Sequence, residues 1–169
     1  QDRPIPSGKA FFYTYSGSRY GLRLAVDDIV PSYDVAGRLV ATIKEDDLVV
    51  DAELELDVRD APISELEIIV PGDMVVASVD GNQVEDYQVS KGQQGGEGTT
   101  VRTIFAKPVI GRALLGMRLE LGRGPLGERQ RIPALEVKGA KTHRGYVVVA
   151  AEAGIEVDDP EVTNLREVH

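Results

Sequence analysis

Apolar and charged residues alternate between Leu48 and Arg59. The apolar members are Leu48, Val50, Ala52, Leu54, Leu56 and Val58, and most residues between them are acidic. A period of two residues is typical of a β-strand with one buried face. We therefore predict a half-buried strand here.

The preceding segment, 35–44, alternates in the same way and predicts a partner strand. A two-residue turn at Glu45-Asp46 pairs Ile43 with Leu48, and it also places Arg38 opposite Glu53. Apolar residues then face apolar residues, whereas a slip of one position would place them opposite charged ones. Glu-Asp is not a favoured pair for a two-residue hairpin turn. A four-residue loop that keeps the same side chains on the same faces is therefore the alternative.

Further alternating or apolar runs, separated by turn residues, predict more strands. They span 10–15, 20–26, 64–70, 74–79, 83–89, 101–105, 113–121, 132–138 and 146–151. The last run is nearly all apolar, so we expect it at the centre of a sheet. The glycine-rich stretch 92–98 is expected to be a loop.

No segment shows a sustained helical period. Asp159 and Pro160 suit the start of one short helix over 161–166. About ten strands predict an all-β fold, an antiparallel β-sandwich with at most one short C-terminal helix.

The chain has 169 residues and no cysteine, which excludes disulfides and thiolate chemistry. We expect a single domain over 1–169, with flexible ends at 1–8 and 166–169. Since residue 1 is Gln, we expect a processed or excised part of a longer protein. No apolar run approaches the length of a membrane span.

The net charge of −9 is unevenly distributed. Residues 1–90 hold 7 basic and 18 acidic residues, a net −11, whereas residues 102–144 hold 10 and 3, a net +7. The two regions either complement each other as neighbouring strands or form a basic surface for an anionic partner. Overall acidity argues against nucleic-acid binding.

Carboxylates offer two kinds of candidate site. Asp51, Glu53, Glu55 and Asp57 share one strand face, and alternate positions are about 6 to 7 Å apart, which suits paired catalytic carboxylates. A solvated sheet face is the simpler interpretation. Calcium binding is an alternative at three acidic clusters, at 27–28, 45–47 and 158–159, although none of them has EF-hand spacing.

Other catalytic chemistry finds little support. His143 is the one histidine away from the C-terminus, and it is expected in an exposed turn. No zinc motif, serine nucleophile elbow or phosphate loop occurs. We therefore expect no enzyme activity, with a carboxylate-based hydrolase left open, and no cofactor.

Two groups of residues are candidates for binding. Five of the nine aromatic residues lie within 11–20, and an exposed row can stack on sugars or on a partner's apolar surface. The aromatic candidates are Phe11, Tyr13, Tyr15 and Tyr20. The basic candidates, for an anionic surface, are Arg118, Arg123, Arg129, Arg131, Lys141 and Arg144. The alternatives are an aromatic edge to the core and a solvated basic loop.

The run from Glu65 to Gly81, then Tyr87-Gln88-Val89 and a strand after Pro108, resembles the β-rich N-terminal saddle domain of the zinc aminopeptidase N family. It also resembles β-sandwich modules of large bacterial exported proteins. The stretch covers about residues 20–121. The family's zinc motif and its Gly-Ala-Met-Glu-Asn loop are absent, so the resemblance implies architecture and a non-catalytic role.

These observations support three hypotheses. The first is a non-catalytic β-sandwich module with a binding or spacer role in a larger bacterial exported or envelope protein, periplasmic or at the cell surface. A cytoplasmic location is the alternative, since the lack of cysteine fits both compartments. The second is a carbohydrate-binding or carbohydrate-active domain. The third is a protein-interaction or oligomerisation domain that uses residues 102–144. The expected partners are other domains of the same chain, another protein or a glycan.

Overall fold

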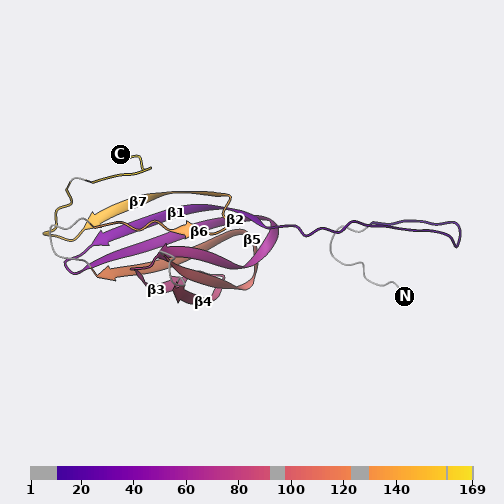
Figure 1. Ribbon diagram of the computed structural model, residues 1–169, viewed down its shortest axis with the longest axis horizontal. Helices are drawn as coiled ribbons and strands as arrows, with labels where there is room; N and C mark the ends of the chain where they lie inside the picture. Colours follow the sequence, from indigo (N-terminus) through magenta and orange to yellow (C-terminus); the bar gives the residue numbers. More distant parts are fainter. Residues whose placement is uncertain (1–10, 92–97, 123–129, 159, 169) are drawn as a thin grey trace.

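A computed structural model describes residues 11–91, 98–122, 130–158 and 160–168. Seven strands form one continuous mixed sheet, and the described residues contain no helix. The strands are β1 (Ser32–Ile43), β2 (Asp47–Pro71), β3 (Val75–Asp80), β4 (Val84–Lys91), β5 (Gly98–Gly122), β6 (Glu136–Val137) and β7 (Thr142–Ala151). Figure 1 shows them as a twisted body from which residues 11–31 project as an arm.

The β1–β2 hairpin has the predicted register. Ile43 pairs with Leu48 and Arg38 pairs with Glu53. The Lys44 amide donates to the Asp47 carbonyl at 2.8 Å, so residues 45 and 46 form the two-residue turn. Alternation, the short turn and the charges of Arg38 and Glu53 specify this pairing, because a slip of one position would bury charge.

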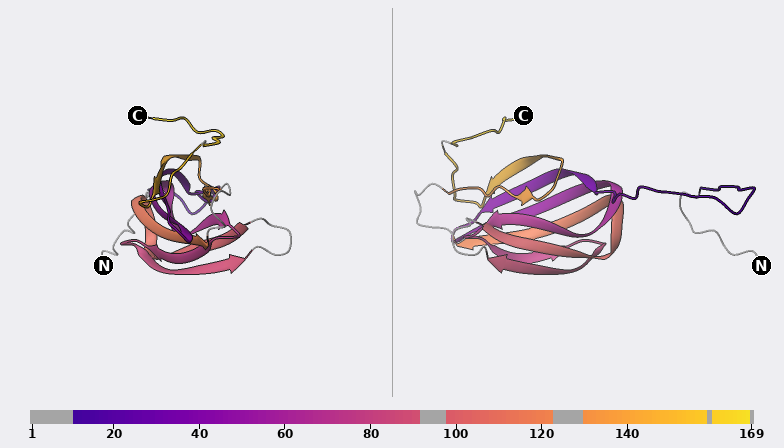
Figure 2. Two further views of the ribbon diagram at one scale, coloured as in Figure 1. Left: turned by 90° about the vertical axis from the view of Figure 1, so that its left-hand side faces the viewer. Right: turned by 45° about the vertical axis from the view of Figure 1, so that its right-hand side comes forward.

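Two strands of 25 residues bend and so contribute to both layers of the sandwich (Figure 2). The ladder between β2 and β5 shifts register between Val58 and Glu65, where Asp60 has a φ of 69°. On β5, Gly111 has a φ of 82°, which glycine adopts without strain. The expected separate strands at 48–59 and 64–70, and at 101–105 and 113–121, are therefore continuous.

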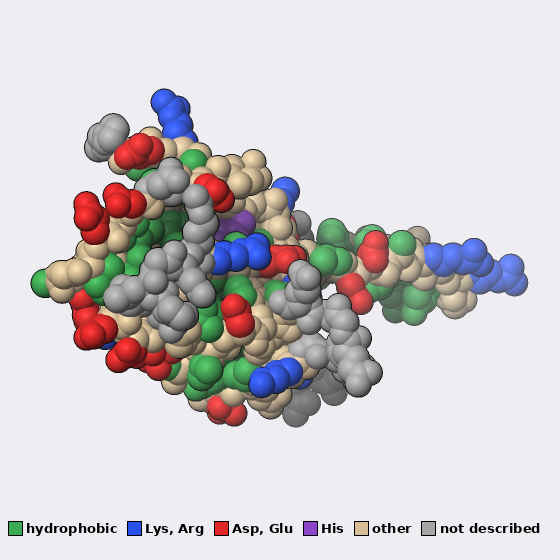
Figure 3. Space-filling view, turned by 60° about the vertical axis from the view of Figure 1, so that its left-hand side comes forward, with side chains coloured by type: hydrophobic (Ala, Val, Ile, Leu, Met, Phe, Trp, Pro, Cys, Tyr) green, Lys and Arg blue, Asp and Glu red, His purple; other side chains and the backbone are tan. Residues whose placement is uncertain are grey.

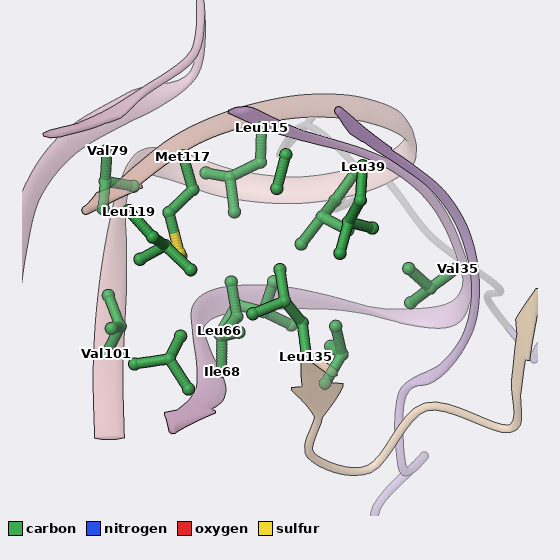
Figure 4. Close-up of a cluster of buried hydrophobic side chains, with 14 of the residues drawn as sticks. Val35, Leu39, Leu66, Ile68, Val79, Val101, Leu115, Met117, Leu119 and Leu135 are labelled. Carbon is green, nitrogen blue, oxygen red and sulfur yellow. The ribbon is translucent and has the colours of Figure 1, made fainter. Parts of the chain in front are cut away.

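The bend defines the layers. One layer runs β7-β1-β2-β5-β3 and uses the first half of β2 with the second half of β5. The other contains the remaining halves of β2 and β5, flanked by β6 and β4. Leu39 and Leu115 of the first layer point toward Leu66 and Leu135 across the core (Figure 4).

Several sequence predictions are wrong in detail. Residues 10–15 and 20–26 were expected as strands; Ala10 lies outside the described residues, and the other positions form no strand. The 132–138 strand is reduced to Glu136–Val137. The helix over 161–166 is absent, and Asn164 has a left-handed φ of 57° that interrupts a right-handed helix. Asp159 lies outside the described residues.

Strand direction also differs from a purely antiparallel sandwich. β7 lies beside β1 and runs parallel to it, from Asp34 opposite Thr142 to Ile43 opposite Ala151. β7 was expected at the centre of a sheet, but it is an edge strand. A strand with apolar side chains on both faces is usually buried on both faces. The β7 side chains are instead mostly exposed.

Candidate interaction surface

β7 presents an uncovered apolar edge. Tyr146 is 55% exposed, Val148 is 42% and Val149 is 46%. β1 occupies one edge of β7, and none of the described residues pairs with the other. Natural edge strands are commonly protected by charges, prolines or covering loops. Residues 145–151 contain no charge and no proline, so this edge is suited to accept another strand.

The odd-numbered residues of β7 face the sandwich interior. Val147 is opposite Leu39 and Val149 is opposite Ala41, both of which are buried core residues. His143 lies on the same face, with its Nε2 atom 3.4 Å from the position of a Cβ built on Gly37. It is therefore an exposed strand residue, not the turn residue that the sequence predicted. Val147 and Val149 on this face are nevertheless 36% and 46% exposed.

Backbone contacts hold β7 against β1 at both ends. The Lys141 amide donates to the Tyr33 carbonyl at 2.8 Å, and the Glu152 amide donates to the Ile43 carbonyl at 2.9 Å. Between them, Gly145 and Gly37 lie opposite each other. A Cβ on Gly145 would lie 2.0 Å from the Gly37 carbonyl oxygen. The close approach of the two strands thus requires glycine at position 145.

A side-chain contact also fixes the start of β7. The Thr142 hydroxyl donates to Asp34 Oδ1 at 2.6 Å, and the Arg59 guanidinium donates to Oδ2. The Thr142 hydrogen bond is the largest cause that lowers the pKa of Asp34; desolvation opposes it, and the charge of Arg59 is the next cause that lowers the pKa. The contact therefore stabilises the fold above the ordinary aspartate pKa of about 3.9 and is lost as the pH falls through the lower folded value.

We expect Thr142→Val to raise the pKa of Asp34 toward its ordinary value, because the substitution removes a hydrogen bond to the charged carboxylate. Carboxyl-carbon NMR titration of the two proteins measures the change. Thr42→Val on β1, away from Asp34, is the control and should leave the pKa of Asp34 as it is. An equal pKa of Asp34 in the Thr142 variant and the unaltered chain would contradict the assignment.

The arm (residues 11–31) is the second exposed apolar feature. Leu22 is 55% exposed, Leu24 is 66% and Val26 is 90%. The arm runs out from the start of β1 and doubles back near its tip (Figures 1 and 2). In the space-filling view it carries hydrophobic side chains along its length and basic side chains toward its tip (Figure 3). Its apolar side chains thus lack a partner surface among the residues that the structure describes.

The aromatic candidates all belong to this arm. Phe11, Tyr13, Tyr15 and Tyr20 are 61–73% exposed, so they do not close the edge of the core. The rings of Tyr15 and Tyr20 stack on each other, with centroids 4.6 Å apart. One face of the Tyr15 ring is therefore covered by the Tyr20 ring and the reverse. The four aromatic residues consequently do not form one continuous surface for stacking.

The basic candidates are dispersed. Arg118 lies on the outer face of β5, where its guanidinium is 3.5 Å from Asp51 and 3.3 Å from Glu120. Arg131 is exposed in the coil before β6. Lys141 and Arg144 lie at the start of β7 and are exposed. Arg123 and Arg129 lie outside the described residues, as do residues 92–97 of the expected loop.

The acidic row forms cross-strand ion pairs with the basic half of the chain. Asp51 pairs with Arg118, Glu55 pairs with Arg112 at 3.5 Å, and Lys138 pairs with Glu67 at 3.0 Å. The paired side chains are between 40% and 83% exposed, so each pair contributes little stability. The opposite charges of the two regions thus meet as neighbouring strands, on a solvated face.

An open hollow of about 530 Å³ lies on the same face. Asp51, Glu53 and Asp80 line it with Arg38 and Arg118. The described residues contain no group of three acidic or histidine side chains close enough to hold a metal ion. A hydrolase pair needs one desolvated carboxylate, and Asp51, Glu53 and Glu55 are all exposed.

Comparison with known proteins gives similarity of fold only. No family model and no curated protein matches the chain. Part of an M1 zinc metallopeptidase from Deinococcus radiodurans is similar with 17% identity and a TM-score of 0.42, over 59% of this chain and 23% of that one. A non-cellulosomal cohesin from Archaeoglobus fulgidus has 10% identity and a TM-score of 0.38, over 72% and 92% of the two chains.

A third similar structure is the cohesin module of a family 33 glycoside hydrolase from Clostridium perfringens. It has 8% identity and a TM-score of 0.34, over 74% of this chain and all of that module. In the described residues, no helix has the length and apolarity to cross a membrane. The M1 metallopeptidase and the cohesin modules are thus what the chain is similar to, and the chain itself is all-β over the described residues.

Proposed function

We propose that this chain is a non-catalytic β-sandwich module whose open β7 edge binds an extended segment of a partner protein as an additional strand. The observation that carries the proposal is the exposed edge of β7, which has no charged residue over 145–151 and no strand partner among the described residues. Strand addition satisfies the free backbone groups of such an edge, and side-chain pockets then select the sequence. Within this proposal, the module belongs to a larger exported protein, as we expect from the sequence.

The edge offers both the main-chain and the side-chain part of such recognition. Val147 and Val149 lie beside the buried Leu39 and Ala41 of β1 and are themselves partly exposed. An added strand with apolar residues at alternate positions would therefore bury those residues beside these two valines. Each fully buried aliphatic side chain contributes about 1.5 to 3 kcal/mol.

A display library of ten-residue peptides tests the proposal on the full chain. We expect enriched peptides to alternate apolar and polar residues and to protect β7 amides from hydrogen exchange. Val148→Lys is the control variant, because a lysine on an edge strand opposes pairing. Equal enrichment on the variant, or no enrichment on a chain that sedimentation shows to be monomeric, would overturn strand addition at β7. A glycan array run in parallel tests the sugar-binding alternative.

A further inference from the structure

We propose that the strand added to β7 is residues 20–26 of the arm of a second copy of this chain, running antiparallel to β7. This inference rests on the proposed function and names its partner. The chain itself holds both halves of such an interface. The arm has alternating apolar side chains without a surface, and β7 is an apolar edge without a strand.

Side-chain parity agrees with this pairing. Placing Leu24 opposite Val147 also places Leu22 opposite Val149 and Tyr20 opposite Ala151. Val147, Val149 and Ala151 share the interior face of β7, since they pair with Leu39, Ala41 and Ile43 of β1. The apolar arm residues would therefore lie beside the partly exposed Val147 and Val149 on the interior face of the sheet, while Arg23 would point to solvent.

Charge selects this register among those of equal parity. It places Asp27 opposite Arg144 and Arg19 opposite Glu152, one pair at each end of the added strand. None of these four side chains has an ion-pair partner among the described residues. A slip by two positions keeps the parity but places Asp27 opposite Thr142 or Tyr146, and both ion pairs are lost.

The direction of the arm favours a second copy. The arm leaves the start of β1 and extends away from its own β7 (Figures 1 and 2). In that position it can reach the edge of a neighbouring molecule. If two copies exchange arms, each edge is covered by an identical contact, and the assembly closes as a two-fold dimer.

Engineered cysteines test the register directly, because the chain has none of its own. A Leu24→Cys chain is mixed with a Val147→Cys chain under mild oxidation. Opposed residues of an antiparallel pair lie within disulfide range. An Arg23→Cys chain mixed with the Val147→Cys chain is the control, because residue 23 faces the other side of the strand. We expect about tenfold more mixed disulfide for residue 24 than for residue 23, identified by mass spectrometry.

Charge reversal provides an independent test by sedimentation of the full-length chain. Asp27→Arg and Arg144→Asp should each raise the dimer dissociation constant about two- to fivefold, as expected for an exposed ion pair. The double variant restores opposite charges across the interface, so its constant should return to that of the unaltered chain. Purely additive losses in the double variant would contradict the proposed register.

The outcomes separate the two proposals. Peptide binding at β7 without a disulfide between copies would overturn the second copy as partner and leave strand addition intact. A disulfide within one monomeric chain that carries both cysteines would show that the arm covers its own β7, which also overturns the second copy. Absence of both peptide binding and cross-linking would overturn both proposals.

Discussion

A Leu54→Ala chain is expected to lose about 2 to 5 kcal/mol of unfolding free energy. Leu54 is fully buried at the centre of β2, between Gly37 of β1 and Leu115 of β5. A Cβ built on Gly37 would lie 3.4 Å from Leu54 Cδ2. Leu54 therefore covers a position that has no side chain of its own, and its truncation leaves a void that Gly37 does not fill.

Denaturant unfolding followed by circular dichroism measures this loss. Leu114→Ala is the matched control, because Leu114 is a leucine on the adjacent strand β5 but is 53% exposed on the outer face. That substitution should change the unfolding free energy by no more than about 0.5 kcal/mol. Similar losses in the two variants would contradict the assignment of inner and outer faces.

Gly145→Ala is expected to have the second largest effect, about 1 to 3 kcal/mol, as for overpacking of a well-packed site. The new Cβ would lie 2.0 Å from the Gly37 carbonyl oxygen, and that atom belongs to the backbone of β1. The strands must therefore separate, which weakens the β1–β7 ladder on both sides of Gly145. We expect β7 amides to exchange faster with solvent while β2 amides keep their protection.

Gly122→Ala is the control for this prediction, since a Cβ at Gly122 meets nothing within 4 Å. Gly116→Ala is an intermediate case, because its Cβ meets only the Asp80 carboxylate, which can rotate away. We expect the loss of stability to decrease from Gly145 to Gly116 to Gly122. Equal losses at the three positions would exclude the close approach of β7 as the cause.

The sequence predicted the elements whose two faces differ in polarity. The β1–β2 register followed from the alternation around Leu54 and from the charges of Arg38 and Glu53. The pairing of the acidic half with the basic half was one of the two interpretations considered, and the ion pairs of Asp51 and Glu55 confirm it. In these strands a wrong register buries charge, so the pattern specifies the partner.

The candidate surface was not predictable in the same way. Tyr146 to Ala151 are apolar on both faces, and such a run does not distinguish a covered central strand from an uncovered edge. The arm has the alternation of a strand over 20–26, but no described residue pairs with it. Both errors arise at apolar segments without a partner, and these are the segments to which we assign binding.

The parallel β1–β7 pair also determines how the chain responds to tension. The chain enters β1 at Ser32 and leaves β7 at Ala151, and these residues lie at opposite ends of the pair. A pulling force applied to the two sides of the module therefore loads all ten paired positions in shear at once. An antiparallel pair pulled from its adjacent ends would open one hydrogen bond at a time. The β1–β7 pair therefore resists stretching until its hydrogen bonds break together.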